Sequence, residues 1–351
     1  MHHLDDDADA DNRADNQTGP GEDGPARRAP VLTLRDVVGA LERLWPLSRA
    51  AEWDRVGLVT GDLDQPVRRI LFALDPTLAV IEEARAWRAD LLVTHHPLLL
   101  RGVHSVATTS AKGASVTGLV RAGCALYVAH TNADVADPGV STVIADALGL
   151  TQQRPLSDLG GYAAGRVGLL AEPASLAAFA DRLVEALPAT AGGVRVSGPP
   201  DATVRTVAVM GGSGDDQFEA ARGSGADVYV TADLRHHPVL EAREEARDGT
   251  PYVIDAGHWA MESLWLAVAR EQLLQALGEE ADHDVGQTLV EGPEGEATGG
   301  AVAHSGDESG DEPSAAAAPT RVVGRLSGVR TEPWTFVAGA NRTRPQPGGV
   351  S

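Results

Sequence analysis

The chain has 351 residues, and 43% of them are apolar, which suffices for one large domain or two ordinary ones with a substantial core. Lys and Arg number 29 against 50 Asp and Glu, a net charge of -21, which argues against nucleic acid or anionic lipid as the main binding partner. The single cysteine, Cys124, excludes an intramolecular disulfide framework and any thiolate-rich zinc or iron–sulfur site.

The N-terminal segment, residues 1–29, is rich in Asp, Asn, Gly and Pro and has almost no apolar side chain. It cannot bury enough surface to offset the entropy of an ordered chain, so we expect disorder. It also lacks the basic start and apolar stretch of a signal peptide, and no apolar run in the chain reaches the roughly 18 residues of a membrane span. A single cysteine suits a reducing compartment, so we expect a cytoplasmic protein. Because no apolar run is long enough to span a bilayer, we expect no membrane partner.

The first folded part, residues 30–155, shows a strand–helix–strand pattern with a strand at 69–75, a helix at 77–87 and a strand at 89–94. A third apolar strand follows at 125–129. The second strand runs into a His-His-Pro sequence, and the third runs into His-Thr-Asn-Ala-Asp.

The next part, residues 156–277, repeats this plan, with a strand at 204–210, a helix at 215–222, a strand at 226–231 and a third strand at 251–254. Its second strand also leads to His-His-Pro, and its third leads to Asp-Ala-Gly-His-Trp-Ala-Met-Glu. The pattern predicts an α/β protein built from two similar lobes. In open α/β sheets the reactive groups gather beyond the carboxyl ends of the strands, which is where these polar sequences fall.

An acidic stretch, residues 278–319, contains 11 Asp and Glu and no Lys or Arg. We interpret it as a disordered insertion. It precedes a short strand and a buried anchor within residues 320–338, which we assign to the second lobe, and residues 339–351 read as a loose tail.

The histidines concentrate where the strands end. Of eleven in the chain, seven lie in the folded parts, all at or just beyond strand ends. One such histidine alone would most simply be structural, whereas seven gathered in loops suggest a metal site. They are His95, His96, His104, His130, His236, His237 and His258.

The spacing of these residues indicates two metal ions. His258 and Glu262 lie one helical turn apart on one face and can converge on one ion. His95 and His96 are adjacent and diverge from an extended backbone, so they suit two neighbouring ions. Two four-coordinate ions need about eight ligand positions, which these four residues and Asp134 fill together with a bridging carboxylate and a bridging hydroxide. Imidazole and carboxylate ligands suit Zn, Mn, Fe or Ni alike.

At this point the chain resembles a known family, the NIF-three-like proteins, also called dinuclear metal centre hexameric proteins, whose bacterial members bear the name GTP cyclohydrolase 1 type 2 homolog. The resemblance spans about residues 31–277 and 320–336. The matching sequences begin at residues 52, 94, 130, 211, 227 and 255 and read Glu-Trp-Asp-Arg-Val-Gly-Leu, Thr-His-His-Pro-Leu, His-Thr-Asn-Ala-Asp, Gly-Gly-Ser-Gly, Asp-Val-Tyr-Val-Thr-Ala-Asp-Leu and Asp-Ala-Gly-His-Trp-Ala-Met-Glu.

The resemblance implies that the family's metal ligands fall on His95, His96, Asp134, His258 and Glu262, with Glu262 as the bridge. It also implies an α/β fold of two interleaved lobes with helices packed on mixed sheets, and a homohexamer. Arg55 replaces the usual Asn and Ala232 a common Gly, and the acidic insertion is unusual; none of these changes touches a ligand.

Other polar residues have two interpretations each. His237 could carry a proton in the reaction or orient another loop. His130 is better explained as a group that supports a ligand or caps a strand than as a ligand. Asp75 and Asp233 could accept an imidazole N–H or cap a helix. The glycine-rich sequence at 211–214 could bind a phosphate on its backbone N–H groups, but a tight turn is the commoner explanation.

The function that follows is a metal-dependent hydrolase in which two ions make hydroxide available at neutral pH, with Glu262 and His237 as the catalytic candidates. By resemblance, the reaction is hydrolytic opening of the guanine ring of GTP. A phosphoesterase would use the same groups. The alternative from another class is a non-catalytic metal-binding or regulatory hexameric scaffold.

Overall fold

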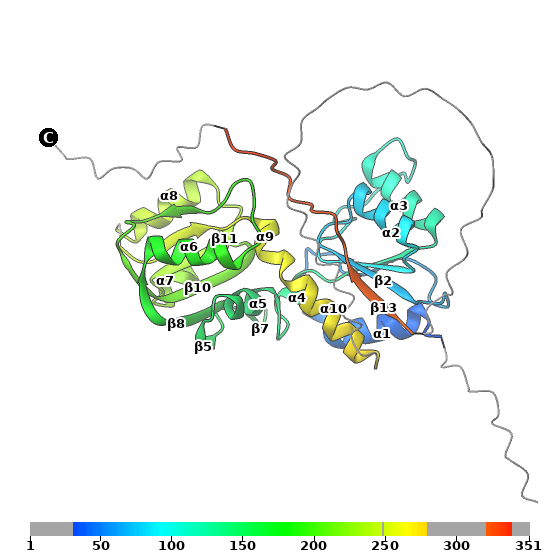
Figure 1. Cartoon of the computed structure of the whole chain (residues 1–351), viewed down its shortest axis with the longest axis horizontal. Coiled ribbons are helices and arrows are strands. Elements are labelled where there is room, and N and C mark those ends of the chain that lie inside the picture. The colour runs from blue at the N-terminus through cyan, green and yellow to red at the C-terminus, as the bar shows by residue number, and fades with distance from the viewer. Residues whose placement is uncertain (1–30, 248, 279–320, 339–351) are drawn as a thin grey trace, which may run out of the picture. The chain divides into compact units, whose positions relative to one another are not determined.

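The computed structural model describes residues 31–247, 249–278 and 321–338 (Figure 1). Apart from Gly278, the segments predicted to be disordered, 1–29, 278–319 and 339–351, lie outside the described residues. The described part is α/β, with helices packed on mixed sheets, as predicted. None of its helices combines the length and the apolar character that a membrane span requires.

The first sheet has five strands in the order β1-β4-β3-β2-β13. Strands β2, β3, β4 and β13 are parallel, and β1 runs antiparallel to β4. The strand bounds are β1 Gly57–Thr60, β2 Arg69–Ala73, β3 Leu91–Thr94, β4 Ala125–Val128 and β13 Val323–Leu326.

Both faces of this sheet are covered by helices. Helices α1 (Leu34–Leu44) and α10 (Trp265–Ala276) lie on one face, and α2 (Leu78–Trp87) and α3 (Ala111–Ala122) on the other (Figure 1). Ile70 and Phe72 of β2 pack in the core beneath α1 and α10, whereas Leu71 and Ala73 pack with residues of α2 and α3. This alternation explains why β2, β3 and β4 are apolar at consecutive positions, since these strands are buried on both sides.

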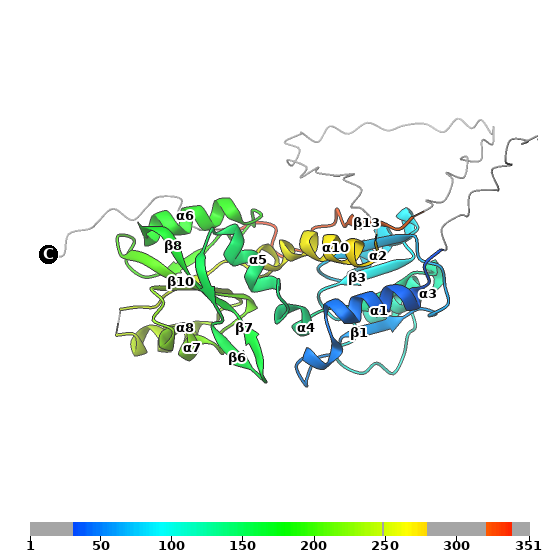
Figure 2. The same ribbon diagram turned by 90° about the horizontal axis from the view of Figure 1, so that it is seen from below.

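The second sheet has six strands in the order β5-β8-β10-β11-β12-β9. Helices α5 (Val140–Ala147) and α6 (Leu176–Ala186) lie on one side, and α7 (Phe218–Gly223) and α8 (His236–Glu245) on the other (Figure 2). The strand bounds are β5 Thr151–Arg154, β8 Arg166–Ser175, β9 Arg195–Ser197, β10 Thr203–Ser213, β11 Val228–Ala232 and β12 Tyr252–Asp255. The hairpin of β6 (Ser157–Leu159) and β7 (Tyr162–Ala164) forms a separate two-stranded sheet.

The repeated plan is confirmed in three dimensions. Strands β2, β3 and β4 of the first sheet correspond to β10, β11 and β12 of the second, each a parallel trio in chain order. In both sheets the third strand of the trio has an antiparallel neighbour on its far side, β1 in one and β9 in the other. The remaining short helices are η1 (Leu47–Arg49), α4 (Thr131–Asp134) and α9 (His258–Ser263).

The boundaries predicted for the two lobes were wrong at both ends. Strand β5 lies within the predicted first lobe, 30–155, but pairs with β8 of the second sheet. Strand β13 lies within 320–338, assigned to the second lobe, but pairs with β2 of the first sheet. The reason is helix α10, whose Trp265 packs on Trp45 of the first core at a ring distance of 5.1 Å and brings the chain back to that sheet.

The predicted buried anchor after this strand was also wrong. Trp334 and Phe336 expose 71% and 77% of their surface. The chain is instead held on the protein just after β13, where Ser327 N donates to Phe72 O at 2.7 Å.

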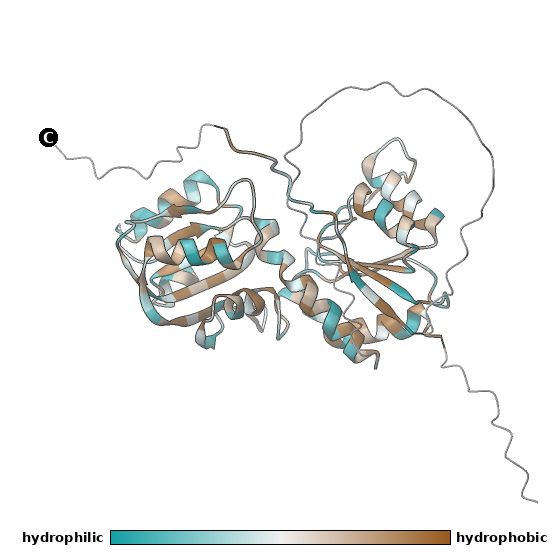
Figure 3. Ribbon diagram, viewed as in Figure 1, coloured by the Kyte–Doolittle hydropathy of each residue, from teal (hydrophilic) through white to brown (hydrophobic). Residues whose placement is uncertain are grey.

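Hydropathy follows this architecture. The strands of both sheets are apolar, and polar residues gather on the outer faces of the helices (Figure 3). The large buried aromatic side chains, such as Trp45, Trp265, Tyr127 and Tyr229, lie in these layers.

Candidate metal centre

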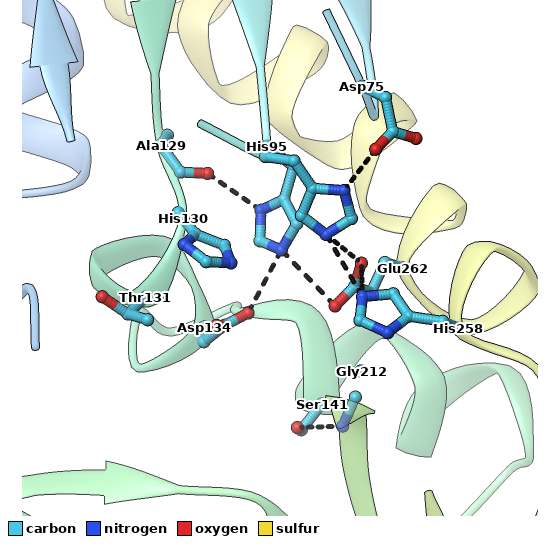
Figure 4. Close-up of polar contacts among 12 residues, drawn as sticks. Asp75, His95, Ala129, His130, Thr131, Asp134, Ser141, Gly212, His258 and Glu262 are labelled. Carbon is cyan, nitrogen blue, oxygen red and sulfur yellow. Dashed lines mark hydrogen bonds and ion pairs between the residues drawn. The ribbon is translucent and has the colours of Figure 1, made fainter. Parts of the chain in front are cut away.

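The polar sequences predicted at strand ends come together in one cluster (Figure 4). His95 and His96 follow β3, helix α4 with Asp134 follows β4, and helix α9 with His258 and Glu262 follows β12. His96 Nε2 and His258 Nε2 are 3.2 Å apart although 162 residues separate them in the chain. The cluster therefore joins the ends of strands from both sheets.

One group of three atoms matches the edges of a metal coordination shell. Glu262 Oε2 lies 2.9 Å from both His96 Nε2 and His258 Nε2. In a tetrahedral zinc site with bonds of 2.0–2.1 Å, neighbouring ligand atoms are about 3.3 Å apart. The spacing of His96, His258 and Glu262 is close to that value, so these three residues could hold an ion.

A second group lies on the other side of Glu262. His95 Nε2 is 3.5 Å from Asp134 Oδ1 and 3.7 Å from Glu262 Oε1. The two oxygens of one carboxylate thus face two different sets of ligand atoms (Figure 4). The structure brings together all five residues that the sequence predicts as metal ligands.

Two buried atoms of the cluster, His95 Nε2 and Asp134 Oδ1, have no hydrogen-bond partner. Leaving buried polar atoms unpaired is costly, and such atoms call for a partner. A cation between them would satisfy both, so the donor set fits a metal ion.

The charges of the cluster also favour a cation. Burial acts to raise the pKa of Glu262, but the surrounding imidazoles hold that pKa well below its usual range. Burial acts to lower the pKa of His96 and His258, but carboxylates on both sides outweigh it and raise the pKa values to about 9 and about 11. The site therefore attracts positive charge, which protons supply when metal is absent.

The other ring nitrogen of each candidate ligand is held by a fixed acceptor. His95 Nδ1 donates to Ala129 O at 2.8 Å. His96 Nδ1 donates to Asp75 Oδ1 at 2.7 Å, and His258 Nδ1 donates to Asp233 Oδ2 at 2.8 Å. These bonds leave each Nε2 lone pair directed at the cluster. Of the two interpretations of Asp75 and Asp233, the structure therefore supports the imidazole acceptor.

His130 has the same arrangement as the predicted ligands. Its Nδ1 lies 2.9 and 3.0 Å from the two oxygens of Asp54. Ligand nitrogens of His95, His96 and His130 all lie within 4.8 Å of one another. Sequence reasoning favoured a supporting role for His130, whereas the structure places it among the imidazoles as a further group that could hold metal.

Asp54 is a site residue to which sequence reasoning gave no role. Its buried carboxylate also accepts hydrogen bonds from Thr131 Oγ1 at 2.6 Å and Thr131 N at 3.1 Å. These bonds fix the start of α4, which carries Asp134. Burial acts to raise the pKa of Asp54, but the bonds from His130 and Thr131 hold it far below its usual range.

Asp54→Asn should destabilise the metal-free protein by about 1–3 kcal/mol at pH 7, because a buried acceptor of several hydrogen bonds loses its charge. The contribution of a carboxylate with a lowered pKa is complete above its unfolded value of about 4 and is lost as the pH falls below that value. Urea unfolding with a chelator present should therefore show a difference in the free energy of unfolding between variant and wild type, and this difference should become smaller below pH 4. A difference that stays constant with pH would contradict this account.

Comparison with known proteins agrees with this fold. Residues 32–290 match the family Duf34/NIF3 (NGG1p interacting factor 3). The chain belongs to the Duf34/NIF3 family. A Streptomyces coelicolor protein named GTP cyclohydrolase 1 type 2 homolog is 51% identical over 245 residues, which cover 68% of this chain and 85% of that protein. The Mycobacterium tuberculosis protein of the same name is 32% identical, over 70% of this chain and 93% of its own length.

Solved structures show the same fold. A Bacillus cereus protein related to NIF3 matches with a TM-score of 0.69 and 22% identity, over 88% of this chain and all of that one. Reduced HcgD from Methanocaldococcus jannaschii matches with a TM-score of 0.60 and 29% identity, over 71% of this chain and 96% of its own.

In this Duf34/NIF3 protein, the glycine-rich sequence at 211–214 has a structural role that was not predicted. Strand β10 runs through it, and Gly212 has a φ of +68°. A Cβ on Gly212 would lie 2.2 Å from Glu262 Oε1. The glycine therefore makes room for the central carboxylate, and the structure supports neither a phosphate loop nor a simple turn here.

His237 lies apart from the cluster of this family member. Its side chain is exposed on the first turn of α8, with its ring against that of His236 at 5.1 Å. Among the described residues, no hydrogen bond or ion pair links it to the five candidate ligands. Its predicted part in proton transfer stays a prediction.

Proposed function

We propose that this chain is a hydrolase with two divalent metal ions, held by His95, His96, Asp134, His258 and Glu262, and that its substrate is GTP. The observation that carries the proposal is Glu262, whose side chain is 4% exposed and whose two oxygens face two separate sets of ligand atoms. When bound, two such ions lower the pKa of a water toward about 7 and polarise the bond under attack. Zn, Mn, Fe and Ni all suit these ligands.

The chain's own residues orient the centre. Ala129 O, Asp75 and Asp233 fix the tautomers of the three candidate histidine ligands, and Asp54 does the same for His130. The orientation of each imidazole ring is therefore fixed, with its Nε2 directed at the cluster. His237 is our candidate for proton transfer with solvent, in keeping with its exposed side chain.

A planar substrate is supported by Trp53. Its side chain is 59% exposed, and its ring lies edge-on to His130 at 5.9 Å. An exposed indole beside the cluster is suited to contact with a flat base. The name GTP cyclohydrolase 1 type 2 homolog, which the curated relatives carry, points to guanine as that base.

The test is turnover by protein loaded with each candidate metal, with formate release from GTP as the readout and a phosphodiester as the second substrate. We expect metal-dependent formate release and a lower rate for His237→Asn at unchanged metal content. Cleavage of the phosphodiester without formate release from GTP would show that the activity is that of a phosphoesterase and not of a GTP cyclohydrolase. Full metal content with no turnover of either substrate would instead support the non-catalytic scaffold.

A homohexamer is part of the proposal, with Trp334 and Phe336 as exposed apolar side chains available for contact between subunits. Light scattering of the full chain measures the assembly directly. A cytoplasmic location is also proposed, in keeping with the buried free thiol of Cys124.

A further inference from the structure

The segment after β13, residues 327–338, is here called the C-terminal strap. It leaves the edge of the first sheet and passes the carboxyl end of β2 (Figure 1). Its start is fixed on helix α2, because Glu83 accepts hydrogen bonds from Gly328 N at 3.0 Å and from Ser327 Oγ. Arg325 of β13 pairs with the same carboxylate at 3.1 Å. The strap is thus anchored before it reaches the metal centre.

Thr331 of the strap touches the acceptor that holds a candidate ligand. Its hydroxyl donates to Asp75 Oδ2, and the other oxygen of Asp75 accepts the His96 Nδ1 hydrogen at 2.7 Å. His96 Nε2 in turn faces Glu262 Oε2 at 2.9 Å. A continuous chain of polar contacts therefore runs from Thr331 to the central carboxylate.

Arg330 gives the strap a second contact with the same half of the cluster. Its guanidinium lies over the ring of Trp259 at 4.5 Å, and Trp259 directly follows His258 in α9. Val329 packs on the apolar cluster beneath α2 and α3. Consecutive strap residues therefore contact the neighbours of His96 and of His258, the two imidazoles that lie 3.2 Å apart.

We propose that the C-terminal strap is a working part of the metal centre, and that Thr331 is a positioning residue for His96 that acts through Asp75. The inference rests on the proposed function in one respect, that the cluster binds metal. With both oxygens occupied, the Asp75 carboxylate cannot rotate away from His96. Removal of the hydroxyl leaves Oδ2 without this partner and frees the carboxylate, so His96 loses its fixed orientation.

The test compares zinc affinity of the full chain in four forms by competition with a chromophoric chelator. Loss of a residue that hydrogen-bonds to a metal ligand typically lowers metal affinity 10- to 100-fold. Thr331 lies one hydrogen bond further from the metal, because it bonds to Asp75 and not to His96 itself. We therefore expect Thr331→Val to weaken one of the two zinc sites about tenfold. Thr331→Ser keeps the hydroxyl and should retain wild-type affinity. Thr335→Val is the matched control, because Thr335 is an exposed strap residue with no described hydrogen bond.

The outcomes separate this inference from the proposed function. A wild-type protein that binds no zinc contradicts the metal centre itself. Two zinc ions in the wild type with equal affinity in Thr331→Val overturns only the role of the strap, and so does equal weakening by Val and Ser. Should Thr331→Val fail to fold in the presence of chelator, Thr331→Ala provides the same loss of the hydroxyl and must show the same weakened site.

Discussion

Glu262→Gln is expected to lose metal from both halves of the cluster. Metal affinity should fall by more than about 100-fold, which exceeds the loss typical of residues that only hydrogen-bond to a ligand. Glu262 alone supplies an oxygen to each group, Oε2 at 2.9 Å from His96 and His258 and Oε1 at 3.7 Å from His95. Gln replaces one of these oxygens with an N–H donor and removes the negative charge. Elemental analysis after dialysis measures the loss.

The matched control for this substitution is Glu271→Gln on α10. Glu271 is exposed and has no described partner, so the same chemical change there should leave both ions bound. A Glu262→Gln protein that retains two ions per chain would show that this carboxylate does not bridge them, and the assignment of Glu262 as the shared ligand would then have to be abandoned.

Gly212→Ala is expected to abolish metal binding without touching a ligand. The added Cβ would lie 2.2 Å from Glu262 Oε1 and 3.3 Å from its Cδ. Strand β10 cannot easily move aside, because Thr231 Oγ1 donates to Gly212 O at 3.0 Å and Gly211 N donates to Ser141 Oγ at 3.0 Å. The carboxylate must therefore shift, and the free energy of unfolding should fall by about 1–3 kcal/mol.

Gly149→Ala separates this clash from backbone strain. Gly149 has nearly the same φ, +66° against +68°, but nothing lies within 4 Å of its added Cβ. It should lose about 1 kcal/mol of stability from the left-handed backbone and keep its metal. Zinc content and urea unfolding of the two variants decide the matter, and equal zinc content in both would refute the clash.

The places of the five candidate ligands at the edges of the two sheets could be predicted because each follows a strand and because parallel strands present their ends at one edge of their sheet. Periodicity gave the paired position of His258 and Glu262, and the repeated plan gave the two similar lobes. These are local signals, readable within one element and the loop that follows it. The family to which the chain belongs was predicted from the same short sequences.

The missed features all depend on contacts between distant parts of the chain. Asp54 holds His130 from 76 residues away, and Thr331 reaches Asp75 across 256 residues. Nothing in the sequence around Gly212 shows that a carboxylate from α9 will occupy the space of its side chain. The addition of β13 to the edge of β2 was likewise decided by the packing of α10 and not by the strand's own residues.

The exchange of β5 and β13 between the two sheets has a consequence for how the protein can be divided. A fragment ending before β5 would keep His95, His96 and Asp134 but would lack both the strand that completes β2 and the helix that covers its inner face. The complementary fragment would carry β13 and α10 but would lack the first sheet, on which both of them pack. Neither piece is a self-sufficient unit, so we expect co-expressed halves to associate and each half alone to aggregate.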